Sequence, residues 1–238
     1  MAGIECRHLQ KAYAVDGQML SVFKDLHLEI PAGSITVLLG RSGCGKTTLL
    51  RLISGLDKPD AGEIRFSGSH RTAFVFQEPR LMPWLNVWEN VCFGLKKPQI
   101  DKAVIHSLLE TVGLAAFATA YPHQLSGGMQ QRVAIARALA YQPSFIMMDE
   151  PFAALDHFTR RQMQQELIRL QKQQGVSILF VTHSIEEALL LGHKIAILDN
   201  GSIKKELLIE TDSEERDLLS PAFIHRKREI LSQLEIPR

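Results

Sequence analysis

Several features that mark large classes of protein are scarce in this sequence of 238 residues. Its three cysteines, Cys6, Cys44 and Cys92, are odd in number and lack the spacing of metal ligands, so we expect neither a disulfide framework nor a zinc site. The 27 lysine and arginine residues nearly balance the 26 aspartate and glutamate residues, which gives no indication of nucleic-acid binding. The longest apolar runs, residues 35–39 and 178–181, are far shorter than the ~18 residues of a membrane helix.

Repeats and low-complexity segments are also missing, which argues against a solenoid or a tandem array. The first ten residues, MAGIECRHLQ, carry charges where a signal peptide has its apolar centre, so we expect no secretory leader and a reducing compartment. What is present is an ordinary globular composition, 45% apolar and 22% charged. At roughly 100–200 residues per domain, this length suits one large domain or one domain with an inserted lobe.

Short apolar runs alternate with helical patterns along most of the chain. The runs expected to be buried strands are residues 35–39, 73–76, 145–148, 177–181 and 195–198. The helical patterns span residues 47–56, 101–112 and 156–174, and Gly175 is expected to end the last of them. Buried strands that alternate with helices predict an α/β fold, with a parallel sheet covered by helices.

Both ends of this α/β region carry turn signals. The first thirty residues alternate apolar and polar side chains around Asp16-Gly17, which predicts an antiparallel β part at the N-terminus. Asn200-Gly201 predicts a second hairpin, and therefore an antiparallel edge to the parallel sheet. The expected division is a core of about 1–86 and 141–210, an inserted helical lobe of about 87–140 and a helical tail of 211–238.

A phosphate-binding loop follows the first buried strand. Residues 40–47 read GRSGCGKT and match the pattern G-x-x-x-x-G-K-[ST] between a strand and a helix. The glycines let backbone N–H groups face phosphate oxygens, and the positive end of the next helix points at the same oxygens. Lys46 suits the β- and γ-phosphates of ATP, and the Thr47 hydroxyl suits Mg²⁺. The residues expected to bind ATP here are Gly40, Arg41, Ser42, Gly43, Cys44, Gly45, Lys46, Thr47 and Thr48.

Two carboxylates end a later strand, in the sequence FIMMDEP. Asp149 falls at the carboxyl end of that strand, where open α/β sheets bind ligands, and is expected to serve Mg²⁺ directly or through water. Glu150 is the candidate base for the water that attacks ATP. Taken alone, either residue could instead cap the segment that follows.

The octet LSGGMQQR at residues 125–132 opens another helical pattern. Ser126 with the N–H groups of Gly127 and Gly128 can form a second anion site, although Ser126 could also act only as an N-cap. With the phosphate-binding loop upstream and the acidic strand end downstream, this octet resembles the ATP-binding-cassette (ABC) ATPases. Gln77, the triplet ALD that ends at Asp156 and His183 then fall in the order of that family's remaining motifs.

The resemblance implies specific roles and a dimer in which two chains enclose two ATP molecules. Ser126, Gly127, Gly128 and Gln130 would then act on the ATP of the partner subunit. Glu150, His183 and Gln77 would be catalytic, and Thr47, Gln77 and Asp149 would hold the metal. Tyr13 is placed where the family stacks an aromatic ring on adenine. From the residues alone, Tyr13 could be a half-buried sheet residue and His183 a surface residue. Asp156 could cap a helix, contact the partner subunit as in the family, or do both.

An apolar segment with both tryptophans of the chain follows Gln77. Residues 78–95 read EPRLMPWLNVWENVCFGL, and such clusters mark interaction sites, although core of the helical lobe is an equal alternative. In the ABC family this segment forms the groove that receives a short helix of a membrane subunit. The expected apolar anchors are Leu81, Met82, Trp84 and Leu85.

The sequences QEPRLMPWLNVWENV, GRSGCGKTT, ALDHFTRRQMQQEL and SPAFIHRKREILSQL resemble the ATPases of nitrate, sulfonate and taurine importers. That resemblance implies a peripheral homodimer on the cytoplasmic face of the cell membrane, with integral membrane permease subunits and, indirectly, an extracytoplasmic solute-binding protein. It implies no nucleic-acid partner. The alternative is an ABC ATPase of a soluble assembly, such as iron–sulfur cluster biogenesis.

Overall fold

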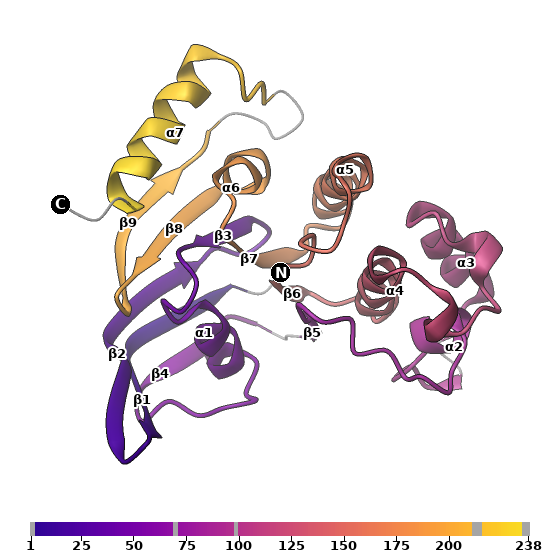
Figure 1. Cartoon of the computed structure of the whole chain (residues 1–238), viewed down its shortest axis with the longest axis horizontal. Helices are drawn as coiled ribbons and strands as arrows, with labels where there is room; N and C mark the ends of the chain where they lie inside the picture. The colour runs from indigo at the N-terminus through magenta and orange to yellow at the C-terminus, as the bar shows by residue number, and fades with distance from the viewer. Residues whose placement is uncertain (1–2, 69–70, 98–99, 211–215, 235–238) are drawn as a thin grey trace.

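The computed structural model describes residues 3–68, 71–97, 100–210 and 216–234, and its strands form two sheets (Figure 1). The larger sheet has six strands in the order β5-β6-β7-β3-β8-β9. In that order its strands are Thr72–Val75, Phe145–Asp149, Ser177–Thr182, Ile35–Leu39, Lys194–Asp199 and Ser202–Leu208. The first five run parallel, and β9 pairs antiparallel with β8 across the turn at Asn200-Gly201. The predicted α/β class with an antiparallel edge is confirmed.

The smaller sheet has the order β2-β1-β4 and is antiparallel. Its strands are Gln18–Ile30, Ile4–Val15 and Ala61–Phe66. Asp16 and Gly17 join β1 to β2 with φ values of 50° and 77°, which is the left-handed geometry of a tight hairpin turn. Leu9 and Leu26 of this sheet are fully buried in one cluster with Leu49 of the first helix, so the inner face of the sheet covers that helix.

Seven helices lie in the described residues. In chain order they are α1 (Lys46–Ile53), α2 (Val87–Val91), α3 (Lys102–Thr111), α4 (Gly127–Ala140), α5 (His157–Gln174), α6 (Ile185–Leu191) and α7 (Pro221–Leu234). Helix α5 ends at Gly175, whose φ of 63° gives the left-handed cap that the sequence predicts. Helix α7 occupies the predicted tail, of which residues 211–215 and 235–238 lie outside the described residues.

Helices α2, α3 and α4 stand to one side of the sheets with two short 3₁₀ turns, Ala115–Phe117 and Pro122–Gln124 (Figure 1). Helix α4 contacts both α2 and α3, and it also contacts the edge strand β5. Helix α4 therefore connects the helical group to the edge of the larger sheet.

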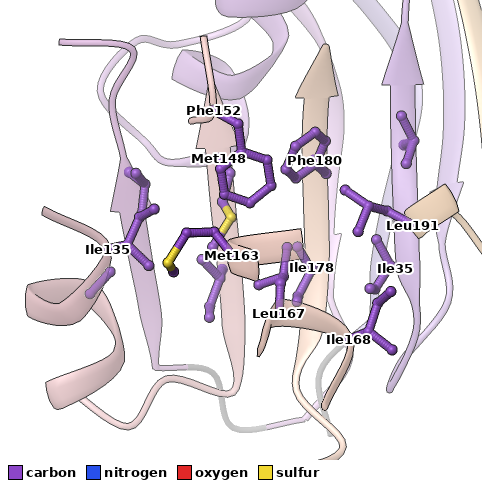
Figure 2. Packing of buried hydrophobic residues seen from close by; sticks show 14 of the residues in the cluster. Ile35, Ile135, Met148, Phe152, Met163, Leu167, Ile168, Ile178, Phe180 and Leu191 are labelled. Carbon is purple, nitrogen blue, oxygen red and sulfur yellow. The ribbon is translucent and has the colours of Figure 1, made fainter. Parts of the chain in front are cut away.

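The core of the larger sheet is built from side chains that the helices press onto its strands. In Figure 2, Met163 and Leu167 of α5 lie over Met148, Ile178 and other apolar side chains of the sheet. These side chains are almost entirely buried, and the strands are buried on both faces, as parallel strands usually are. Such packing fixes the carboxyl ends of the strands, where the site described below is found.

Within the described part of the chain, no helix is long and apolar enough to cross a bilayer.

Candidate functional site

The loop between β3 and α1 is shaped by glycines, two of which have little room for a side chain. A Cβ atom at position 40 would lie 2.5 Å from the carbonyl oxygen of Leu198, and one at position 45 would lie 2.8 Å from the ring of Phe23. Gly43 and Gly45 also adopt φ values of 80° and 108°. The loop therefore has the close-packed glycine geometry that a phosphate cradle requires.

Lys46 and Thr47 begin α1 at the mouth of this loop. The buried Lys46 ammonium donates hydrogen bonds to the carbonyl oxygens of Gly40 and Arg41, at 2.8 and 2.9 Å. It also lies 3.9 Å from a carboxylate oxygen of Glu150. The loop thus holds its cation in place, directed at the space that the glycines leave open.

Asp149 meets Thr47 at the end of β6. The Thr47 hydroxyl donates a 2.8 Å hydrogen bond to Asp149 Oδ2. Burial raises the pKa of the Asp149 carboxyl, and the hydrogen bond from Thr47 opposes that shift. A hydroxyl beside a buried carboxylate is a donor set of hard oxygen atoms, which fits Mg²⁺.

Glu150, the next residue, points into the same space. Its φ of 44° is rare for a residue other than glycine, and its backbone N–H donates to the carbonyl oxygen of Val181 at 3.0 Å. This bend directs the side chain toward His183, whose Nδ1 lies 2.9 Å from Glu150 Oε2. The His183 side chain is 63% exposed whereas that of Glu150 is 15% exposed, so the histidine covers the carboxylate from the solvent side.

These residues surround one cavity of about 370 Å³. Nine of the residues predicted to bind or hydrolyse ATP line it, namely Ser42, Gly43, Gly45, Lys46, Thr47, Thr48, Gln77, Glu150 and His183. Thr47 and Gln77 also line the adjoining hollow, together with Asp149. The cavity has an apolar wall at Val22, which no sequence motif indicated. Cys44 does not line the cavity. Its sulfur packs against Gly40, where a Cβ atom would lie only 2.6 Å from it.

Tyr13 does not join these residues. Its hydroxyl donates a 2.6 Å hydrogen bond to Asp57 Oδ2, and the Lys11 ammonium lies 5.0 Å from the centre of its ring. The side chain therefore has the half-buried sheet position that was the alternative at this residue, and adenine stacking by Tyr13 stays a prediction.

The start of α4 lies outside this cavity. Ser126 Oγ accepts a hydrogen bond from the backbone of Met129 at 3.2 Å, so Ser126 is the N-cap. A Cβ atom at position 128, where the chain has glycine, would lie 3.3 Å from the carbonyl oxygen of Ala154. The Gln130 amide donates to carbonyl oxygens of its own chain, on Pro122 and Leu125. Ser126, Gly127, Gly128 and Gln130 are not among the described residues that line the cavity.

Two other residues of α4 connect it to the segment around Gln77. The buried Gln131 donates from its amide to the carbonyl oxygen of Phe76 at 3.1 Å. Arg137 donates to the carbonyl oxygens of Pro79 and Arg80, at 2.9 and 3.0 Å. The sequence placed Gln131 in the LSGGMQQR octet and showed Arg137 as a polar position further along the same helical pattern, but it could not show their hydrogen-bond partners.

Asp156 acts as the cap of α5. Its carboxylate accepts hydrogen bonds from the backbone N–H groups of Phe158 and Thr159, both at 3.0 Å. Hydrogen bonds from Thr159, by side chain and backbone, lower the pKa of the Asp156 carboxyl. The cap that the sequence left open is therefore confirmed, whereas contact with a second subunit stays a prediction.

The tryptophan-bearing segment is held rigidly at the surface. Trp84 is 69% exposed, although Val87 and Val91 of the adjoining helix are buried. The fully buried Asn90 binds this segment by accepting from the Met82 N–H at 2.8 Å and by donating to nearby carbonyl oxygens, including that of Leu85. Core packing therefore does not account for Trp84, and an apolar ring is presented on an ordered base.

Comparisons with known proteins show which family the chain resembles. The profile of the family described as ABC transporter matches residues 23–153, which include the glycine loop, Gln77, the start of α4 and both acidic residues of the site. The aliphatic sulfonates import ATP-binding protein SsuB 1 of Streptomyces avermitilis is 42% identical over 231 residues, covering 94% of this chain and 87% of that protein. The aliphatic sulfonates import ATP-binding protein SsuB of Bacillus subtilis is 40% identical over 236 residues, covering 95% of this chain and 92% of that protein.

Among solved structures, the ATP-binding cassette MJ0796 is similar along its whole length. Its dimeric structure in a post-hydrolysis state, bound to ADP and Pi, superposes with a TM-score of 0.81 at 32% sequence identity. The match covers 87% of this chain and 99% of that one.

Proposed function

The chain belongs to the ABC transporter family, and we propose that it energises an importer for an organic sulfonate or a similar small oxyanion. It is an ATP-hydrolysing subunit of an ABC importer, as the resemblance of its motifs implied. The ATPase part of the proposal rests on the convergence of Lys46, Glu150 and His183 on one cavity. The substrate class rests on relatives that are named as aliphatic sulfonates import proteins. The alternative to transport was an ABC ATPase of iron–sulfur cluster assembly. It gains no support, because the relatives described above are named as import proteins.

The cavity suits the triphosphate of ATP. The glycine loop offers backbone N–H groups, and the Lys46 ammonium would exchange the two loop carbonyls for β- and γ-phosphate oxygens. Thr47 and Asp149 would hold Mg²⁺, with Gln77 beside them, and the ion would neutralise charge on the phosphates. Val22 would provide an apolar contact at the cavity wall.

Glu150 is the proposed general base. Its carboxylate would accept a proton from water as that water attacks the γ-phosphate, and ADP and phosphate would leave. His183 already lies 2.9 Å from this carboxylate, so it would hold Glu150 in position and contact the γ-phosphate from the exposed side. The strained backbone at Glu150 supports the same role, because such conformations gather at functional sites.

Two further subunit contacts belong to the proposal. A second copy of the chain would place its Ser126, Gly127, Gly128 and Gln130 over the ATP bound here, as in a dimeric cassette. Permease subunits in the membrane would dock on Trp84 and its apolar neighbours, and the chain would then lie on the cytoplasmic face of the membrane. An extracytoplasmic solute-binding protein would deliver the solute without touching this subunit.

A growth experiment with a matched catalytic variant tests the proposal. A strain that lacks this gene, supplied with the wild-type gene, should grow on an alkanesulfonate as sole sulfur source. The same strain supplied with Glu150→Gln should not grow, because an amide cannot accept the proton from water. Purified Glu150→Gln should still bind ATP but turn over at least about 100-fold more slowly.

The two parts of the proposal can fail separately. Normal growth of the deletion strain on the sulfonate, with growth on sulfate as the control, would reject the substrate class but not the ATPase. Near-normal hydrolysis by Glu150→Gln would remove that residue from the role of base.

A further inference from the structure

Two histidines and an aspartate meet on the outer face of the three-stranded sheet. His8 lies in β1, and Asp25 and His27 lie in β2. His8 Nδ1 is 2.9 Å and His27 Nε2 is 3.1 Å from the same carboxylate atom, Asp25 Oδ1. One ligand atom from each side chain lies within 4.8 Å of the other two, a geometry found for no other histidine, cysteine or carboxylate triplet of the described residues.

A β-bulge brings these side chains to one face. Two residues of β1, Arg7 and His8, oppose the single residue His27 of β2. The extra residue keeps Leu9 on the buried face and turns His8 outward, where regular alternation would have reversed the two. His8 adopts a φ of 51°, and its carbonyl oxygen would lie 2.3 Å from a Cβ at position 62, so Gly62 is needed for the bulge.

We propose that His8, Asp25 and His27 bind a divalent transition-metal ion such as Zn²⁺. Two imidazole nitrogens and one carboxylate oxygen are a common ligand set for Zn²⁺, with a water molecule as the fourth ligand. Ligand atoms placed tetrahedrally at about 2.0–2.1 Å from zinc are about 3.3 Å apart. The two nitrogen–oxygen distances here need to open by only a few tenths of an ångström to reach that spacing.

The cluster is open to solvent, and two arginines of the same sheet are paired with other residues. Arg7 lies 2.7 Å from Glu5, and Arg65 lies 2.6 Å from Glu63. The three side chains are 50–72% exposed, so a hydrated ion can reach them and keep its water ligand. Exposed hydrogen bonds of this kind stabilise a fold little by themselves.

The ion would join β1 to β2 on the side of the sheet opposite α1. Beneath the site, Leu9 and Leu26 are fully buried against that helix. None of the three ligands lines the ATP cavity, so we expect the metal to stabilise the sheet without taking part in hydrolysis.

Zn²⁺ titration of the nucleotide-free full chain by calorimetry tests the site. The wild-type chain should bind one more equivalent of Zn²⁺ than His8→Gln or His27→Gln, or bind Zn²⁺ more than about tenfold more tightly. The reason is that even residues that only hold a metal ligand in place change metal affinity by about 10–100-fold when they are replaced. His106→Gln is the matched control, since His106 pairs with Glu110 on an exposed helix face and should leave the titration unchanged.

Thermal unfolding supplies the second measurement. Zn²⁺ should raise the Tm of the wild-type chain above its value in EDTA, and this rise should be absent in Asp25→Asn. In EDTA the two chains should have the same Tm, because Asp25 is exposed. Identical Zn²⁺ isotherms for the wild type and all three ligand variants would overturn the proposal. So would a Zn²⁺-dependent rise in Tm that survives in them.

Discussion

At Asp149, the nucleotide-free fold favours a protonated carboxyl, whereas the proposed Mg²⁺ needs an ionised one. Its carboxyl is 5% exposed at the end of β6, and burial raises its pKa more than the Thr47 hydrogen bond lowers it. A raised pKa means that the nucleotide-free fold is favoured when this group is protonated. That contribution is complete below the usual aspartate pKa of about 3.9 and is lost as the pH rises through the raised value.

Asp149→Asn should therefore stabilise the nucleotide-free chain at neutral pH. An amide keeps the hydrogen bond from Thr47 but carries no buried charge, so the Tm should rise by about 2–4 °C, the change that about 1 kcal/mol gives in a chain of this size. The difference from wild type should shrink as the pH falls toward 4. Calorimetric Tm values across that range, without Mg²⁺ or nucleotide, check it.

Asp156→Asn is the matched control for that substitution. Hydrogen bonds lower the pKa of the Asp156 carboxyl, so its ionised form supports the fold above the usual aspartate pKa. Asparagine is also a good N-cap, and the Tm at neutral pH should fall slightly or stay unchanged. If the Tm of Asp149→Asn were also below that of the wild type, the buried charge of the Asp149 carboxylate would be compensated within the fold.

Helix α2 and the loop before it form the element that is proposed to meet the membrane subunits. Trp84 is 69% exposed, and truncation of a central aromatic anchor costs about 2 kcal/mol or more of binding, or about 30-fold in affinity. Trp84→Ala should weaken co-purification with co-expressed permease subunits, whereas the Tm and the ATPase activity of the isolated chain should stay near wild type.

Two variants separate docking from packing in this experiment. Val91→Ala removes a fully buried side chain of α2 and should lower stability by about 1 kcal/mol or more. Leu208→Ala removes an exposed apolar side chain of β9 and should change neither stability nor docking. If Trp84→Ala behaves like Val91→Ala, the ring belongs to the core of the helical group.

The elements that the sequence predicted are those with local causes. Buried strands such as β3 follow from continuous apolar runs, and the turn at Asn200-Gly201 and the cap at Gly175 follow from residues that accept positive φ. The lining of the ATP cavity could be predicted for the same reason, because the glycine loop and the ends of parallel strands must meet at one edge of the sheet.

The features that escaped prediction depend on partners distant in sequence. The bulge at His8 exists because Gly62 of β4 leaves room for it, and the Tyr13 hydroxyl finds its partner in Asp57, 44 residues away. Gln131 finds its carbonyl partner on Phe76 across the fold. A polar residue in an amphipathic pattern shows that it has a hydrogen-bonding capacity, but only the packed chain decides which group satisfies it.

At the scale of the whole molecule, the signature residues of a chain lie apart from its own ATP cavity. Lys46 lines the ATP cavity, whereas Ser126 at the start of α4 lies outside it. If the signature residues act across a dimer, as proposed, the two defects should complement each other. Lys46→Ala should abolish hydrolysis by weakening phosphate binding, and Ser126→Arg should abolish it by blocking the partner's ATP.

A mixture of these two inactive variants should regain activity. In a heterodimer, the intact Lys46 of one chain would face the intact Ser126 of the other, whereas the second site would carry both defects. Random exchange gives about half heterodimers with one working site each, so about a quarter of wild-type turnover per chain is expected. The control is each variant mixed with itself. If the mixture stays as inactive as its components, although chromatography in ATP shows dimers, the signature residues do not act on the partner's nucleotide.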